Sequence, residues 1–211
     1  MESKVVERDN TLRIPVEADA IKLSVELGWD PKAGLLVNKV IDAIEVAATG
    51  ESKNAYDLDL AAIIEYSNDK KADLIFHGQG FKFDKAESVV LGADSRTGLH
   101  KGVNERITVH LARIPAEVKR ILFFVNIHEG EKDLKYLGDV ANAFIQIQSD
   151  ERSVYSEMEA FKSEDAKDAS SLVFAALVRD GDGWVIQGMS RYGAGNDAHD
   201  VYEGITGAAF R

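Results

Sequence analysis

The chain has 211 residues, of which 45% are hydrophobic and 29% charged, an ordinary composition for a globular protein with one large or two small domains. Its formal net charge is −11 and its pI is about 4.9, which disfavours binding to the phosphate backbone of nucleic acids. The sequence contains no cysteine, so disulfides, thiolate zinc sites and cysteine nucleophiles are excluded.

The first predicted element is a half-buried strand. Apolar residues alternate with polar ones at Ile21, Leu23, Val25 and Leu27. The segment "GWDP" at 28–31 is expected to form a turn that ends this strand. Residues 1–15 are expected to form an extension or an edge strand. They contain no apolar segment of the kind found in secretory signals, so a cytoplasmic location is expected.

The next segment departs from the β pattern. Apolar residues recur at three- and four-residue spacing at Leu36, Val37, Val40, Ile41, Ile44 and Ala47. This spacing predicts an amphipathic helix over about 34–48, within a helical insertion at 31–55. We expect its apolar stripe either to cover an open face or edge of the fold, or to form a surface for self-association or for a protein partner.

The remaining chain is a series of short strand patterns. In "YDLDLAAIIEY" (56–66), one face is apolar and the other carries Asp57 and Asp59. The later patterns are "ADLIFHG", "ESVVLG", "ERITVHL", "RILFFVNIH", "NAFIQIQS", "LVFAALVRD" and "WVIQGMSRYG". Between the last two, "DGDG" at 180–183 is expected to be a hairpin turn, because it lacks the closing glutamate of an EF-hand. A second helix is expected near "DAHDVYEGITGAAF".

These elements predict a single, mainly β domain over 1–211. It is expected to be an antiparallel β-sandwich with the inserted helix and short peripheral helices. The longest apolar run in the predicted sheet is "ILFFV" at 121–125, which is too short to span a bilayer. The protein is therefore not expected to be embedded in a membrane.

Signatures of common enzymes are missing from the sequence. No phosphate-binding loop is present, "GQGFKF" lacks the third glycine of a dinucleotide fingerprint, and neither "GADSRTG" nor "GMSRYG" has the spacing of a nucleophile elbow. The histidines are scattered, at His77, His100, His110, His128 and His199. None forms an H-x-x-x-H pair, and His77 and His128, which each end a strand, are assigned to loop contacts.

Acidic residues form the most informative pattern. Asp57 and Asp59 project from the same side of a strand, about 6.5–7 Å apart along the backbone. Asp94 lies in a glycine-bounded loop that Asn104 and Glu105 close. If the loop folds over the strand end, the oxygens converge as Ca²⁺ requires, since this ion takes 6–8 oxygen ligands. On spacing alone, the alternative of a solvent-facing strand and an ordinary turn is favoured.

Six motifs in order resemble the TerD family, the tellurium-resistance and general stress proteins of bacteria. They are "LGWD", "YDLDLAA", "ADLIFHG", "DSRTG", "ILFFVNIHEG" and "NAFIQI", and the similarity runs from about residue 20 to about residue 195. The resemblance implies a two-sheet β-sandwich, no known enzymatic activity and calcium binding by acidic loops. It also implies a cytoplasmic stress role with docking to membrane-bound partners of the same resistance system.

The family's "DLD" strand matches 57–59 and its "DNRTG" loop matches 94–98, where Arg96, Thr97 and Gly98 are expected to organise the loop. Typical members continue with an acidic run such as "EGDGDDE". Here three of those acids are replaced by Leu99, Lys101 and Val103. The local charge changes from about −3 to +1, and calcium affinity follows the charge of the ligands. Lys101 is expected to pair with an acid of the loop.

Three hypotheses follow for the function. The first is a non-catalytic stress protein that acts as an interaction or scaffold module and whose calcium site is weakened or lost. The second is a functional Ca²⁺-binding module of a metal or tellurite stress system, in which Asp30 or Glu129 assists the acidic cluster. The third is a small-ligand binder or enzyme at the rim of the sandwich, supported only by Asp94, Arg96 and His100.

Overall fold

A computed structural model describes residues 13–16, 20–30, 56–68, 70–77, 82–96, 98, 102–150 and 154–206. The helix predicted over 34–48, the insertion at 31–55 and most of the 1–15 segment lie outside the described residues. So do Thr97, His100 and Lys101, and with them the expected pairing of Lys101 with an acid of the loop.

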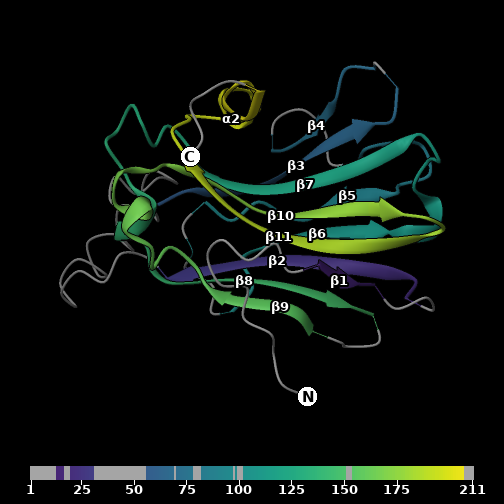
Figure 1. The fold of residues 1–211 in the computed structure, drawn as a ribbon. Helices are drawn as coiled ribbons and strands as arrows, with labels where there is room; N and C mark the ends of the chain where they lie inside the picture. The colour runs from purple at the N-terminus through teal and green to yellow at the C-terminus, as the bar shows by residue number, and fades with distance from the viewer. Residues whose placement is uncertain are drawn as a thin grey trace.

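Two antiparallel sheets form a sandwich, as the strand patterns predict (Figure 1). The six-stranded sheet has the order β1 (Arg13–Pro15), β11 (Gly183–Gly193), β10 (Ser171–Asp180), β7 (Val118–Ile127), β3 (Leu58–Tyr66) and β4 (Asp73–Ile75). The five-stranded sheet has the order β5 (Val89–Leu91), β6 (Glu105–His110), β2 (Lys22–Asp30), β8 (Ala141–Ser149) and β9 (Val154–Glu159). Short 3₁₀ helices occupy Leu111–Arg113, Leu137–Asp139 and Glu164–Asp168, and the helix α2 spans Ala198–Thr206.

The main core lies between the two sheets. Alternate residues of β3, such as Leu58 and Leu60, are fully buried there against residues of β2 and β6. The outer face of the six-stranded sheet is also covered, because α2 packs over it (Figure 1). There Ala61 and Ile63 of β3 join a second cluster with Val201 of α2. Burial on both faces explains why β10 is apolar without interruption in "LVFAALV".

The prediction of a turn at "GWDP" is wrong. Strand β2 continues through Gly28 and Trp29 to Asp30, where it pairs with β8 around an irregularity. A Cβ atom on Gly28 would lie 2.2 Å from the Phe144 ring and 2.4 Å from the Gly102 carbonyl oxygen. The glycine therefore serves close packing of the chain and not a turn. At the other end, Ile21 precedes the strand and is exposed.

Trp29 fixes the loop that follows β5. Its side chain is buried, and its indole Nε1–H donates to the Tyr56 carbonyl oxygen at 3.0 Å. Gly98 lies against the indole with φ of +61°, and a Cβ atom there would be 2.4 Å from Nε1. Both the left-handed backbone and the close contact require glycine at this position.

Replacing Gly98 with alanine tests this packing. The left-handed conformation costs about 1–2 kcal/mol for a non-glycine residue, and the clash with Trp29 adds about 1–3 kcal/mol. Gly181 is a matched control, because its φ is +57° and a Cβ atom would meet nothing within 4 Å. We expect Gly98→Ala to lower the free energy of unfolding, measured in urea, clearly more than Gly181→Ala. Equal losses would contradict the close contact with Trp29.

Candidate metal centre

Three aspartates from two separate segments of the sequence meet at one end of the sandwich. Asp57 and Asp59 lie at the start of β3, and Asp94 lies in the loop after β5. One carboxylate oxygen from each lies within 4.8 Å of the others. The loop after β5 thus folds over the end of the "DLD" strand, as the calcium hypothesis requires.

Glu105 joins the two sheets beside this cluster. It begins β6 in the five-stranded sheet, and its Oε2 accepts a hydrogen bond of 2.6 Å from the Leu60 N–H in the six-stranded sheet. The Leu60 N–H is available because β4 pairs with β3 only at 62–64. Oε1 of Glu105 accepts from the Ser95 N–H at 3.3 Å, which holds the Asp94 loop against the same carboxylate.

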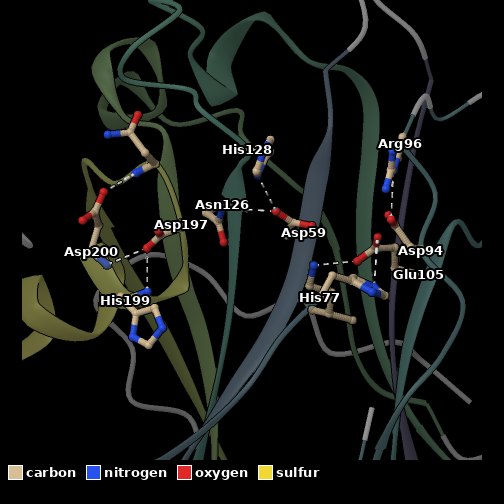
Figure 2. A network of polar contacts seen from close by, with 12 residues as sticks. Asp59, His77, Asp94, Arg96, Glu105, Asn126, His128, Asp197, His199 and Asp200 are labelled. Carbon is tan, nitrogen blue, oxygen red and sulfur yellow. Dashed lines mark hydrogen bonds and ion pairs between the residues drawn. The ribbon is translucent and has the colours of Figure 1, made fainter. Parts of the chain in front are cut away.

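A second group of ligand-type atoms includes a histidine. Atoms of His77, Asp94 and Glu105 lie within 4.8 Å of one another, so that Asp94 belongs to both groups. The imidazole Nε2 of His77 is 3.6 Å from Oε1 of Glu105 (Figure 2). Both side chains are almost inaccessible to solvent, with exposed fractions of 10% and 0%.

Asp59 has two polar neighbours on β7 and just beyond it. The Asn126 Nδ2 donates to its Oδ2 at 3.5 Å, and the His128 Nδ1 lies 3.8 Å from the same oxygen (Figure 2). Asn126 is buried and pairs with Asp59 across β3 and β7, whereas His128 is half exposed. Asp59 is therefore oriented by the sheet itself, with a long hydrogen bond from Asn126 and the His128 ring nearby.

The carboxyl groups of the cluster hold their protons more tightly than usual. Burial, together with the charge of Asp94, raises the pKa of Asp57 to about 6. Burial and the charges of Asp57 and Asp94 raise the pKa of Asp59 to about 7. Burial raises the pKa of Glu105 to about 9, although the N–H groups of Leu60 and Ser95 oppose the shift. Burial and mutual repulsion of these acids therefore outweigh the attraction of nearby positive groups such as Arg96.

One carboxylate oxygen illustrates the cost of burying these acids. Oδ1 of Asp57 is buried and has no hydrogen-bond partner within the described part of the chain. A buried carboxylate oxygen without a donor is costly, because it has lost water and gained nothing in exchange. A cation bound between the three aspartates would supply the missing partner.

The structure places the other residues predicted for the site differently. Oδ1 of Asn104 accepts from the Trp29 N–H at 2.8 Å and so supports the end of β2. Asp30 accepts from the Asn142 side chain, and Glu129 pairs with Lys132. Neither acid belongs to the two groups found among the described residues. Arg96 donates to Asp94 at 3.2 Å and is largely exposed.

His77 and His128 are the site residues that the sequence analysis missed. Assigning His128 to a loop contact overlooked the pairing of β3 with β7, in which Leu58 lies opposite Ile127. For His77 it overlooked the pairing of β3 with β4, in which Ala62 lies opposite Ile75. Continuing that antiparallel register by two residues places His77 opposite Leu60, next to Asp59. The two strands follow each other in the sequence, which is typical of strands that pair. Recognising that pairing would have placed His77 beside Asp59.

Comparisons with known proteins agree with this fold. The TerD domain family matches residues 5–197. The tellurium resistance protein TerX of Serratia marcescens is 30% identical over 192 residues, covering 82% of this chain and 84% of the relative. General stress protein 16U of Bacillus subtilis is 31% identical over 133 residues, covering 62% and 60%. The crystal structure of a homologue of the telluride resistance protein TerD from Streptomyces coelicolor superimposes with a TM-score of 0.63 at 19% identity, covering 83% and 92%.

Among the helices in the described part of the chain, none is both long and apolar enough to cross a membrane.

The raised pKa values predict how stability depends on pH in the metal-free protein. The pKa values of Asp57 and Asp59 in the folded state, about 6 and about 7, exceed the ordinary value of 3.8. Their stabilising protonation is complete below the ordinary pKa and is lost as pH rises through the folded values. We expect these two groups to lower the free energy of unfolding in urea by about 1–4 kcal/mol from pH 5 to pH 8, and Glu105, with a pKa of about 9, to act in the same direction.

Asp59→Asn should flatten this fall, because an amide does not titrate. The control is Asp182→Asn, which changes the same charge in the exposed turn of the β10–β11 hairpin. It should leave the pH dependence unchanged. An Asp59→Asn variant that keeps the full slope would show that the cluster does not hold protons as described.

Proposed function

Because the chain belongs to the TerD domain family, we propose that it is a non-catalytic stress-response module that binds Ca²⁺ weakly at Asp57, Asp59 and Asp94. Its proposed partners are proteins of a bacterial stress or tellurium-resistance system, and its proposed location is the cytoplasm. The names of its relatives, a tellurium resistance protein and a general stress protein, support this role.

The observation that carries the proposal is the buried Oδ1 of Asp57, which no described residue satisfies with a hydrogen bond, beside two further carboxylates. Burial of Asp57 and Asp59 beside Asp94 has an energetic cost, which the raised pKa values of Asp57 and Asp59 reflect. A divalent cation offsets that cost by attraction to all three charges. The residues present therefore fit a hard cation with oxygen ligands.

Calcium fits this donor set better than magnesium. Ca²⁺ accepts irregular coordination at 2.3–2.6 Å and completes its shell with main-chain carbonyls and water, whereas Mg²⁺ demands nearly ideal octahedral geometry. The affinity is proposed to be low, because the loop that is acidic in typical relatives carries Leu99, Lys101 and Val103 here. Three carboxylates remain to set the ligand charge, and that charge largely determines the affinity.

The interaction role follows from charge. The chain has a net charge of −11, so an acidic partner is repelled by the metal-free rim of the sandwich. Binding of a divalent cation among the aspartates reverses that repulsion locally. The proposed output of the module is therefore a change in the surface that a partner meets, with no covalent chemistry.

Thermal unfolding of the metal-stripped protein tests the proposal. Binding to the native state alone adds RT ln(1 + [L]/Kd), about 1.4 kcal/mol at a tenfold excess over Kd, or about 3–6 °C for a chain of this size. We expect millimolar CaCl₂ to raise Tm by this order and MgCl₂ at the same concentration to raise it clearly less. Identical shifts for the two salts would contradict a specific calcium site.

Asp57→Asn should change the two states of the protein in opposite directions. The metal-free variant should be more stable at pH 8, by about 1 kcal/mol or 2–4 °C, because a buried repelling charge is removed. Its calcium-dependent rise in Tm should be lost. Asp182→Asn removes an equal charge from an exposed hairpin turn and should change neither value. If Asp57→Asn keeps the full calcium effect, the proposed ligand set is wrong.

A further inference from the structure

The group formed by His77, Asp94 and Glu105 differs chemically from the three aspartates. It offers an imidazole nitrogen in addition to carboxylate oxygens. Ca²⁺ is bound almost entirely by oxygen, whereas imidazole together with carboxylate suits ions such as Zn²⁺. The two neighbouring groups are therefore suited to different cations, although they share Asp94.

The distance between His77 and Glu105 indicates two ligands of one ion. Nε2 and Oε1 are 3.6 Å apart, which exceeds the 2.7–3.2 Å of an N–H···O hydrogen bond. Two ligands held at 2.0–2.1 Å from a tetrahedral ion lie roughly 3.3–3.4 Å apart. The observed separation is close to that value, so an ion could be accommodated with little movement of either side chain.

The surroundings fix both side chains in advance. Glu105 is held by the N–H groups of Leu60 and Ser95 and is fully buried, and His77 is nine-tenths buried. Ser95, whose backbone N–H donates to Glu105, also has a buried side chain. Its Oγ makes no hydrogen bond to any described residue. Rigid ligands supported by hydrogen bonds lower the reorganisation that binding requires.

We propose that His77, Asp94 and Glu105 form a second cation position that takes a transition-metal ion of the Zn²⁺ class. The position depends on the proposed calcium function only through the shared Asp94. Burial lowers the pKa of His77, and the neutral imidazole is the form that binds metals. A metal ion bound at this position would have three protein ligands and a fourth coordination site open to water.

Titration calorimetry of the metal-stripped chain with ZnCl₂ tests this position. We expect wild-type protein to bind Zn²⁺ and His77→Gln to lose roughly tenfold or more in affinity, because an amide oxygen is a poor ligand for this ion. The calcium-dependent rise in Tm should stay unchanged in His77→Gln. His110→Gln is the control, since His110 lies at the other end of β6, about 17 Å from Glu105 along the strand.

The two proposals fail in distinguishable ways. Asp57→Asn should lose the calcium effect and keep zinc affinity within about threefold, since Asp57 is outside the histidine group. Zinc binding that depends on His77, without any calcium effect, would overturn the calcium function and support this position. Wild-type protein that does not bind Zn²⁺, or His77→Gln that binds it as wild type does, would overturn the second position.

A measurement on the wild-type chain removes dependence on the variant's folding. The ring nitrogens of His77 should shift in ¹⁵N spectra when one equivalent of Zn²⁺ is added, and those of His110 should not. Shifts confined to other histidines would overturn the assignment.

Discussion

The hydrogen bond from the Leu60 N–H to the Glu105 carboxylate is the constraint on which this end of the molecule depends. It connects the two sheets beyond the pairing of β3 with β4, which among the described residues covers positions 62–64 of β3. The same carboxylate accepts from Ser95 and so places the loop that carries Asp94. A single buried acid thus positions the strand, the loop and the cluster relative to one another.

That arrangement has an electrostatic cost. Burial of a carboxylate disfavours its charged form, and the nearby aspartates add to the effect. Protonation or a bound cation can each relieve the repulsion, and they compete for the same oxygens. Two backbone donors are not enough to keep Glu105 ionised beside Asp59 and Asp94. The end of the sandwich is therefore a place where the fold itself favours positive charge.

Much of the fold could be read from alternation, and the exceptions have physical causes. The pattern of β3 correctly places Leu58 and Leu60 on one face and Asp59 on the other. It cannot show that α2 covers the outer face of the sheet, where Ala61 and Ile63 of β3 are buried with Val201 of α2. Gly28 illustrates the opposite error, because glycine in a strand marks close packing as well as turns, and only the contact with Phe144 separates the two.

The candidate site was harder to predict, because its members come from both sheets. Spacing alone could relate Asp57 to Asp59, but the contact with Asp94 depends on the loop after β5, and that of His77 on the register of β3 with β4. Asn104 has a structural contact that its place in the motif does not show, because its amide oxygen accepts a hydrogen bond from the Trp29 N–H.

Sharing of Asp94 makes the two proposed cation positions interdependent. A carboxylate has two oxygens and can serve two ions, which then repel each other through a short distance. The first ion to bind also removes the repulsion that raises the pKa values of the remaining acids, which makes those acids better ligands. These effects oppose each other, and Arg96, which already pairs with Asp94, weakens that residue's attraction for either ion. The balance between them is set by one exposed arginine and one shared aspartate, both on a loop that is anchored through Glu105 and Trp29.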